Sequence, residues 1–489
     1  MRALRAPRAG TGFVAAHIHW STEGKWSRSL TRWASGRSGC VRFFQGRARR
    51  QRRPASRPFH VAAQHCDLRS THSETSDDSM PSRSMDAFAV APMMDVTDHH
   101  FRTMARILSG RALLYTEMVV DATLKYNPHG AERWLAFDAT QSPLVLQLGG
   151  SDPDTMAAAA AIAAQYPYSA ININCGCPSD KVAGSGCFGA ALMRDASRVA
   201  ALCNAIRGHS PPQVPVTVKC RLGVNDSDSY EFVHQFVDTV SRQSEVRHFI
   251  IHARKAVLGG LSPAQNRIVP PLMYERVLAL RDDFPHLQFS LNGGLQELND
   301  VLHYLDAERL HGVMLGRAVM YRPWDLLAGV DEVVYGDRSR VQLIRRQALE
   351  QYGAYMDRLL QPSSVTIRGD AVATAPNTTV PPSLHLLTRP LHGLFWGVPR
   401  VKTWHRYLDA AVQQCKSSAS SPSAPTGDFE WRRELVRIAE QVFEPVHLDT
   451  TWCQQQAQRR EVEAQRQSLK AQPPVAGASV SPAAAAFQA

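Results

Sequence analysis

The chain has 489 residues, 44% hydrophobic and 20% charged, which is typical of a globular protein with a large core. It contains no run of about 18 apolar residues, so we expect no membrane-spanning helix and no membrane partner. The net charge of +11 is concentrated in residues 1–60, which hold fourteen Lys and Arg against one acid.

The basic N-terminal segment, 1–60, is rich in Arg and Ser, which is typical of an organelle transit peptide. Trp, Phe and Leu alternate with the arginines and favour this interpretation over a basic arm that binds nucleic acid. We therefore expect a location in the mitochondrion or chloroplast, and otherwise in the cytoplasm. Residues 61–85 are polar and Ser-rich, and we expect a linker there.

Eight short apolar segments follow, with helical segments between them. They begin at Phe88, Leu113, Leu144, Ala170, Val214, His248, Gln288 and Gly312. Each is too short for a globular helix, and most are rich in Val, Ile and Leu, as buried parallel strands are. Eight strand–helix units predict a TIM (β/α)8 barrel over 86–338, whereas an open doubly wound sheet usually has fewer strands.

The chain changes character after the barrel. Apolar residues recur at helical spacing from Ser339 and again from Leu384, which predicts a small all-helical domain over 339–452. A Pro-, Ser- and Thr-rich insert, 361–383, interrupts this domain, and we expect it to be a disordered loop. The segment 453–489 becomes rich in Ala, Pro and Ser, so we expect a low-complexity tail with a frayed helix at its start.

Nine cysteines are scattered through the chain, three of them between residues 175 and 187. An odd number without a secretory signal argues against a disulfide framework. No second Cys/His pair with zinc spacing follows the first, so we expect no metal. The same segment contains a G-x-G-x-x-G, which lies ten residues past the predicted strand and has no acid over 196–225. We interpret Gly184, Gly186 and Gly189 as an active-site loop rather than a dinucleotide-binding fingerprint.

The carboxyl ends of the strands line the active site of a TIM barrel. Every predicted strand ends in polar or functional groups, namely Met93 and Asp95, Glu117, Gln147, Asn174 and Cys177, Lys219 and Arg221, His252 and Arg254, Asn292, and Arg317. Glycines after the last two strands let backbone amides approach a phosphate, and Arg317 adds a fork of donors. A phosphate site with one Lys, one Gln and one His fits flavin mononucleotide (FMN), because a cation stabilises the reduced flavin.

The predicted strands and the loops that follow them together resemble the tRNA-dihydrouridine synthases, and among these the A-type subfamily. The most specific stretch is "ININCGCPSDKVAGSGCFGAALM" from Ile171; "LLYTEMV", "LQLGGSDP" and "FIIHARKAVLGGLSP" add to it. The resemblance covers 86–335 and resumes at "LHGLFWGVPRVKTWHRYL" from Leu391. It implies an FMN-dependent barrel and a helical tRNA-binding domain. It further implies reduction of uridine to 5,6-dihydrouridine in the tRNA D-loop, at positions 20 and 20a, with NADPH.

The resemblance also implies roles for single residues. The expected FMN contacts are Pro92, Met93, Met94, Gln147, Lys219, His252, Asn292, Gly293, Gly294, Gly316 and Arg317. Cys177 would give a proton to C5 of the uracil after reduced FMN has passed a hydride to C6, since a thiol is mostly protonated at neutral pH. We expect Cys175 and Cys187 to be packing residues.

The expected tRNA contacts are Asn174, Arg267, Lys402, His405 and Arg406. If the segment is helical, Lys402, His405 and Arg406 share one face at i, i+3 and i+4. Ala264 departs from a basic residue common in the subfamily, which implies one contact fewer. The barrel carries no separate NADPH motif, so NADPH would bind transiently over the flavin before tRNA takes its place.

Two other functions remain open at this point. The chain could be an FMN-dependent reductase of a small molecule, of the dihydroorotate dehydrogenase or ene-reductase class, but the added helical domain and the "GCPSD" loop argue against this. It could also be a non-catalytic tRNA-binding protein, but the intact Cys177, Lys219 and His252 argue against that. In the favoured interpretation the partners are tRNA and NADPH, and we expect a monomer.

Overall fold

The computed structural model describes residues 83–179, 182, 188–360, 382–419 and 429–471, together with two short strands near the N-terminus. The chain divides into two units, 1–76 and 77–489. In the first unit, β1 (Ala16–Trp20) pairs antiparallel with β2 (Trp26–Leu30). The rest of the predicted transit segment, the linker up to residue 82, residues 361–381 of the insert and the tail after Ala471 lie outside the described residues.

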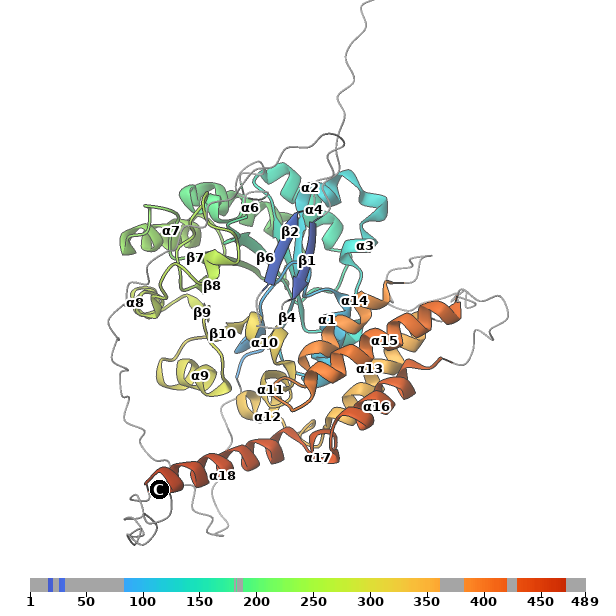
Figure 1. Ribbon diagram of the computed structural model, residues 1–489. Coiled ribbons are helices and arrows are strands. Elements are labelled where there is room, and N and C mark those ends of the chain that lie inside the picture. The colour runs from blue at the N-terminus through green and yellow to red at the C-terminus, as the bar shows by residue number, and fades with distance from the viewer. Residues whose placement is uncertain are drawn as a thin grey trace, which may run out of the picture. The chain divides into compact units, whose positions relative to one another are not determined.

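Eight parallel strands form the centre of the second unit (Figure 1). They are β3 (Phe88–Val90), β4 (Leu114–Val120), β5 (Leu144–Gly149), β6 (Ala170–Cys175), β7 (Val216–Arg221), β8 (His248–His252), β9 (Gln288–Asn292) and β10 (Gly312–Leu315). From β4 to β10 each strand pairs with the next one along the chain, and β10 pairs with β3. The Val90 amide donates to the Leu113 carbonyl at 2.9 Å, which joins β3 to the start of β4. The prediction of a TIM barrel with these eight strands is confirmed.

The strands are apolar on both faces because they pack in two directions. Side chains that point inward form a small central cluster, which includes Ala89, Tyr115, Val145, Ile250 and Met314. Side chains that point outward pack against the surrounding helices in one continuous core. This double burial explains why the strand segments read as unbroken hydrophobic runs.

The helices of the barrel lie outside the strands (Figure 1). They are α1 (His99–Leu108), α2 (Asp121–Tyr126), α3 (Glu132–Leu135), α4 (Pro153–Ala163), α6 (Ala196–His209), α7 (Tyr230–Gln243), α8 (Tyr274–Asp283), α9 (Leu298–Leu302), α10 (Arg317–Tyr321), α11 (Pro323–Leu327) and α12 (Val330–Tyr335). Side-chain caps fix where four of them begin, because Asp98, Asp152, Asp195 and Ser229 each accept a hydrogen bond from an amide in the first turn.

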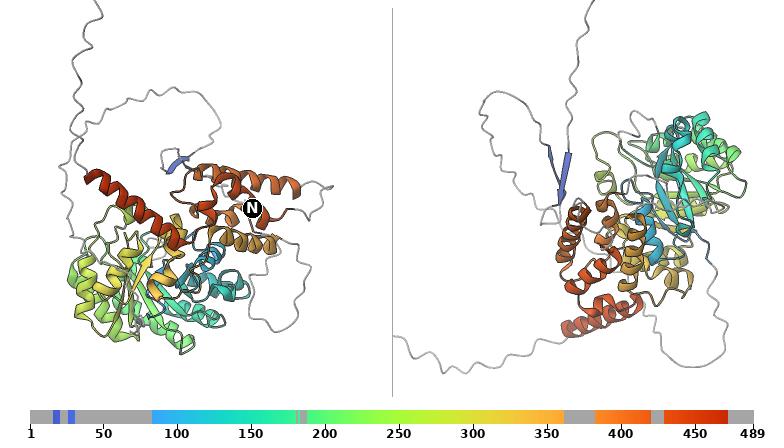
Figure 2. Two further views of the ribbon diagram at one scale, coloured as in Figure 1. Left: turned by 90° about the horizontal axis from the view of Figure 1, so that it is seen from below. Right: turned by 90° about the vertical axis from the view of Figure 1, so that its right-hand side faces the viewer.

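The helical domain lies on one side of the barrel (Figures 1 and 2). It comprises α13 (Arg345–Leu360), α14 (Leu384–Thr388), the short 3-10 helix η6 (Arg389–Gly393), α15 (Val401–Ala419), α16 (Trp431–Val442) and α17 (Pro445–Leu448), and α18 (Trp452–Ala471) follows. We did not predict a separate helix over 431–442. Its buried residues recur at helical spacing, so the signal was present in the sequence.

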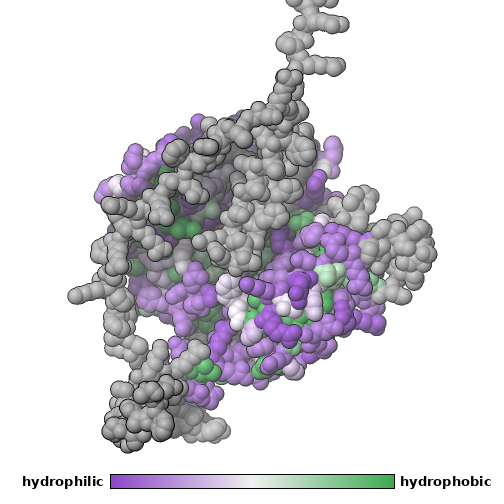
Figure 3. All heavy atoms as spheres, viewed as in Figure 1, coloured by the Kyte–Doolittle hydropathy of each residue, from purple (hydrophilic) through white to green (hydrophobic). Residues whose placement is uncertain are grey.

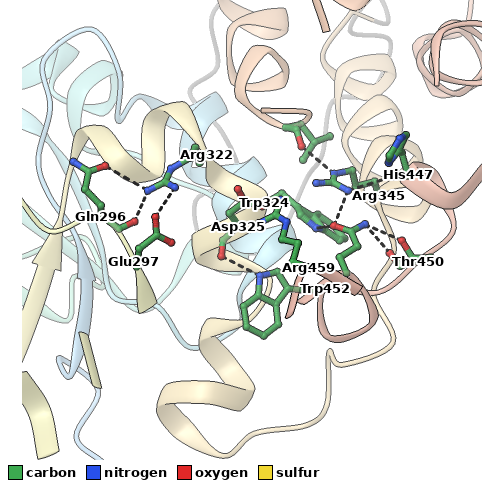
Figure 4. Close-up of polar contacts among 12 residues, drawn as sticks. Gln296, Glu297, Arg322, Trp324, Asp325, Arg345, His447, Thr450, Trp452 and Arg459 are labelled. Atoms are coloured by element: carbon green, nitrogen blue, oxygen red, sulfur yellow. Dashed lines mark hydrogen bonds and ion pairs between the residues drawn. The ribbon is translucent and has the colours of Figure 1, made fainter. Parts of the chain in front are cut away.

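A buried arginine joins the barrel to the helical domain (Figure 4). Arg345 is 1% exposed, and its guanidinium donates to the Leu394 carbonyl at 3.0 Å and to Gln455 Oε1 at 2.9 Å. The same guanidinium lies 4.6 Å from the ring centre of Trp324, whose indole N–H also donates to Gln455 Oε1, at 3.0 Å. Arg345, the first residue of α13, therefore connects α11, the loop after η6, and α18.

The described surface over the helical domain is mostly hydrophilic, with small apolar patches between hydrophilic side chains (Figure 3). No helix among the described residues is both long enough and apolar enough to cross a membrane.

Candidate active site

The turn that carries Cys177 follows β6 directly and is held by a side chain of that strand. Asn174 Oδ1 accepts hydrogen bonds from the backbone amides of Gly176, at 3.0 Å, and Cys177, at 2.9 Å. The Cys177 carbonyl in turn accepts from the Ala190 amide at 2.9 Å. Cys177 remains partly accessible. The turn therefore presents its thiol at the open rim of the barrel on a fixed backbone.

A chain of hydrogen-bonded polar side chains joins the neighbouring strands β5, β6 and β7 next to this turn. Asn174 Nδ2 donates to Gln147 Oε1 at 2.8 Å, and Gln147 Nε2 donates to Asn172 Oδ1 at 2.8 Å. Asn172 Nδ2 then donates to Thr217 Oγ1 at 2.9 Å. Gln147 is 1% exposed, so this predicted FMN contact lies deeper than the rim, and both ends of its carboxamide are hydrogen-bonded.

Among the described residues, the other two thiols near this turn are not available for chemistry. Cys175 and Cys220 face each other in the register of β6 and β7, and both are fully buried. Burial raises the pKa of Cys175 well above its ordinary value and that of Cys220 to about 12. Cys175 is therefore a packing residue, as expected. Cys187 lies outside the described residues.

Arg221 holds the same turn from the neighbouring strand. This side chain is 2% exposed, and its Nε donates to the Gly176 carbonyl at 2.8 Å. Its Nη1 donates to the carbonyls of Lys255, at 3.0 Å, and Asn266, at 3.1 Å. The sequence marks Arg221 only as a polar strand end and assigns it no role. The available signal was its spacing, since it follows Lys219 by two residues and shares that face of β7.

The ends of β7, β8 and β9 bring three predicted FMN contacts together. Lys219 Nζ donates to Asn292 Oδ1 at 3.0 Å, and Asn292 Nδ2 donates to the Met314 carbonyl at 2.7 Å. Burial, with the nearby Arg221, lowers the pKa of Lys219 to about 8, so the amine is still mostly charged at neutral pH. Burial lowers the pKa of His252 well below its usual value, and the positive charges of Arg221 and Lys219 lower it further. This imidazole is therefore neutral.

Two glycines after β9 are required by their backbone and by their neighbours. Gly293 has φ of +109° and Gly294 has φ of +78°, a region that L-residues with side chains rarely adopt. A Cβ on Gly293 would lie 2.4 Å from His252 Cδ2, and one on Gly294 would lie 2.5 Å from Leu272 Cδ1. Tyr274 Oη donates to the Gly293 carbonyl at 2.7 Å and fixes the loop.

The loops after β10 and β3 meet next to the loop of Gly293 and Gly294, because β9, β10 and β3 are neighbouring strands of the barrel. Gly316 precedes α10, and a Cβ on it would lie 3.5 Å from Met93 Sδ. Pro92 and Met93 are half-buried, whereas Met94 is exposed. Arg317, the first residue of α10, is exposed, and its Nη2 donates to the Arg267 carbonyl at 3.2 Å. The predicted phosphate-binding residues are thus on adjacent loops.

Positive charge gathers at this rim. The cations here are Lys219, Arg221, Arg254, Arg267 and Arg317. Burial and the neighbouring cations lower the pKa of the first four, and the groups that oppose this shift are the thiols and phenols of Cys177, Cys220, Tyr274 and Tyr321. The hydrogen bonds described for the side chains of Lys219, Arg221, Arg254 and Arg317 go to carbonyl and carboxamide oxygens, not to carboxylates. A rim with this excess of positive charge suits an anionic ligand, and the residues present therefore fit the phosphate and reduced ring of FMN.

Comparison with known proteins agrees with this arrangement. The profile of the dihydrouridine synthase (Dus) family matches residues 89–367. A protein of Escherichia coli K12 named tRNA-dihydrouridine(20/20a) synthase is 43% identical over 325 residues, which is 66% of this chain and 85% of the relative. Proteins with the same name from Shewanella oneidensis, 41% identical over 328 residues, and Salmonella typhi, 41% identical over 337 residues, are covered to 89% and 92% of their lengths. This chain belongs to the dihydrouridine synthase family.

As a member of a family of flavin-dependent oxidoreductases, the chain is an enzyme. This dihydrouridine synthase has its predicted tRNA contacts in two places. Asn174 and Arg267, the last residue of the 3-10 helix η4 (Gln265–Arg267), belong to the rim of the barrel.

Lys402, His405 and Arg406 lie on α15, within the segment for which the sequence predicts helices. Lys402 and Arg406 are exposed, whereas His405 is half-buried and its Nε2 lies 3.0 Å from the His392 carbonyl oxygen. Two of the three predicted contacts on this helix therefore have exposed charged side chains, and the third packs against η6.

Proposed function

We propose that the chain reduces uridine to 5,6-dihydrouridine in the D-loop of tRNA, with FMN as its flavin and NADPH as the source of electrons. The observation that carries the proposal is the Cys177 thiol, presented by Asn174 and Arg221 at a cationic rim that fits FMN. The relatives' printed names support tRNA as the substrate and positions 20 and 20a as the sites.

The chain's own residues would hold the cofactor. The backbone of Gly293, Gly294 and Gly316 and the side chain of Arg317 would bind the phosphate, because these loops are adjacent and cationic. Lys219, oriented by Asn292, would supply positive charge near the ring. When bound, reduced FMN would supply the hydride that forms the new C6–H bond of the uracil.

Cys177 would complete the reduction by transferring its Sγ proton to C5. The C5=C6 double bond is then replaced by two new C–H bonds, and the thiolate regains a proton from water before the next turnover. Asn174 and Arg221 fix the backbone of the turn and so orient the thiol. A positioned acid of this kind typically contributes about 10²- to 10⁴-fold in rate.

The electron donor and the tRNA would use the same face of the flavin in turn. tRNA would then contact Arg267 at the rim and Lys402, His405 and Arg406 on α15, and the chain would act as a monomer. The Arg-rich segment 1–60 supports action on tRNA in a mitochondrion or chloroplast. Mapping dihydrouridine in organellar and cytosolic tRNA of a deletion strain tests the location, and loss from cytosolic tRNA alone would contradict it.

The direct test of the function compares substrates. The purified protein, supplied with FMN and NADPH, is incubated with unmodified tRNA, with orotate and with a small enone. We expect NADPH consumption coupled to dihydrouridine in tRNA, detected as a mass gain of two hydrogens in the D-loop fragment. Coupled reduction of orotate or the enone, with unchanged tRNA, would replace the proposal with a small-molecule reductase.

A further inference from the structure

Two exposed aromatic side chains meet where the barrel joins the helical domain. Tyr321, the last residue of α10, is 39% exposed, and Trp396, in the loop between η6 and α15, is 52% exposed. Their ring centres are 6.3 Å apart, and the ring planes are inclined by 39°. Trp324 of the barrel and Trp404 and Trp431 of the helical domain are by contrast fully buried, so the exposure of Trp396 is not general for the tryptophans around this junction.

The backbone beneath this pair is fixed on both sides. A Cβ on Gly393 would lie 2.7 Å from Pro323 Cδ and 2.9 Å from the Tyr321 carbonyl oxygen, so η6 rests directly on the turn after α10. Phe395, which precedes Trp396, is fully buried, and the Leu394 carbonyl accepts from Arg345. The backbone that carries the two rings is therefore fixed before any ligand binds, which reduces the entropy lost on binding.

The pair is continuous with the cationic rim of the active site. α10 is five residues long, and it begins at Arg317 and ends at Tyr321. Arg267 is close enough to Cys177, Arg317 and Tyr321 for all three to act on its pKa. Arg400, four residues after Trp396 in the loop before α15, adds an exposed positive charge on the helical-domain side of the pair. Aromatic rings between cations are the combination that binds unstacked bases of single-stranded RNA.

We propose that Tyr321 and Trp396 form a stacking platform for an unpaired base of the tRNA loop, beside the uridine that is reduced. The inference rests on the proposed function and extends it to a second nucleotide. A uridine that enters the site must leave its stack, which exposes the faces of neighbouring bases. Every base offers such a face, so the platform would position the loop without reading its sequence.

The test measures tRNA affinity of the FMN-loaded full chain at several salt concentrations. Loss of one stacked base weakens binding by about 5- to 150-fold, and we expect this for Trp396→Ala. Trp396→Phe should recover most of the affinity, whereas Trp396→Leu should not. Stacking releases no counterions, so the slope of log affinity against log salt should stay as in the unchanged protein.

Matched controls come from two other exposed aromatic residues beside a cation. Trp134, next to Arg133, and Tyr126, next to Lys125, lie on the segment that leads from α2 back to β5. Their alanine variants should bind tRNA within about twofold of the unchanged protein. Full FMN binding by Trp396→Ala would show that the site remains folded.

The outcomes separate the two claims. If the unchanged protein forms dihydrouridine but Trp396→Ala and Tyr321→Ala bind tRNA as tightly as it does, the platform is wrong and the function stands. The platform would also be wrong if Trp396→Leu bound tRNA as tightly as Trp396→Phe. It would be wrong, too, if Trp396→Ala reduced the slope of log affinity against log salt. If the unchanged protein forms no dihydrouridine in any tRNA, the proposed function itself is wrong.

Discussion

At the scale of single residues, the site depends on side chains that orient the backbone around Cys177. Asn174 accepts from the Cys177 amide, and Arg221 donates to the Gly176 carbonyl, so two neighbouring strands fix one short turn. Asn174 was expected to lie beside the substrate. The structure adds that its carboxamide oxygen already serves this turn, which leaves its remaining Nδ2 hydrogen for a ligand.

The thiol itself gives the first prediction. Cys177→Ala should retain FMN but reduce the rate of tRNA reduction by about 10²- to 10⁴-fold, because no other described thiol at the rim is accessible. The rate is measured in a single turnover with pre-reduced protein. Cys175→Ala, which changes a buried neighbour, serves as the control and should keep most of the activity. Near-normal turnover by Cys177→Ala would remove this residue from the mechanism.

Lys219 gives a pH prediction. Its pKa of about 8 in the ligand-free protein means that it loses its proton as the pH rises through that value. A bound anion favours the charged amine and raises this pKa, so affinity for FMN should be constant below about pH 8 and should fall above it. The limit is about tenfold per pH unit. Titration of the apoprotein by flavin fluorescence measures this.

The matched variant for this titration is Lys219→Gln. It should bind FMN more weakly, and its affinity should show no bend near pH 8, because the titrating group is gone. An unchanged bend in Lys219→Gln would assign the titration to another group.

At the scale of elements, the loops after β9 and β10 form the phosphate side of the site. Gly293→Ala should weaken FMN binding, because its Cβ would displace His252 and because the left-handed φ costs about 1–2 kcal/mol for a residue with a side chain. Gly259→Ala is the control. Gly259 also has a positive φ, +76°, but a Cβ added to it would meet no atom within 4 Å. Equal loss of FMN affinity in both variants would show that backbone strain alone matters.

Helix α15 gives a prediction about salt. Lys402→Ala and Arg406→Ala should each weaken tRNA binding and reduce the slope of log affinity against log salt by about 1, because each removes one phosphate contact. Arg433 on α16 is the control, because it is exposed and forms an ion pair with Glu430 at 2.9 Å. An unchanged slope in both variants of α15 would move the tRNA contact to another surface.

The strands and their chemistry were readable from the sequence, whereas the contacts across them were not. Eight apolar segments predicted the eight strands because parallel strands are buried on both faces. The role of Arg221 needs three carbonyls, from Gly176, Lys255 and Asn266, that lie on different loops. Only the closed ring brings these loops together, so no local pattern could assign the role.

At the scale of the whole molecule, the position of the helical domain depends on contacts of Arg345 with residues that are distant in the sequence. Arg345 reaches Gln455, 110 residues away, and stacks on Trp324 of the barrel. A sequence pattern marks Arg345 only as one of several arginines on a helix. Its neighbour Arg346, by contrast, is partly exposed and pairs with Asp449 at 2.6 Å.

This adjacent pair of arginines gives the prediction for the assembly of the two parts. Arg345→Met leaves buried oxygens of Leu394, His447 and Gln455 without this donor, and should lower the free energy of unfolding by about 3 kcal/mol. Arg346→Met removes only exposed ion pairs and should cost about 1 kcal/mol or less. Thermal unfolding of the two variants measures the difference. Equal effects would show that Arg345 does not join the barrel to the helical domain.

The central claim is that electrons held at the barrel rim pass to uridine in tRNA. The most direct measurement is an anaerobic single turnover, in which the flavin of the purified protein is first reduced and unmodified tRNA is then added. We predict that the absorbance of oxidised flavin returns and that one dihydrouridine forms in the D-loop for each flavin reoxidised. Reduced flavin that persists in the presence of tRNA, or that reoxidises without changing any uridine, would contradict the account.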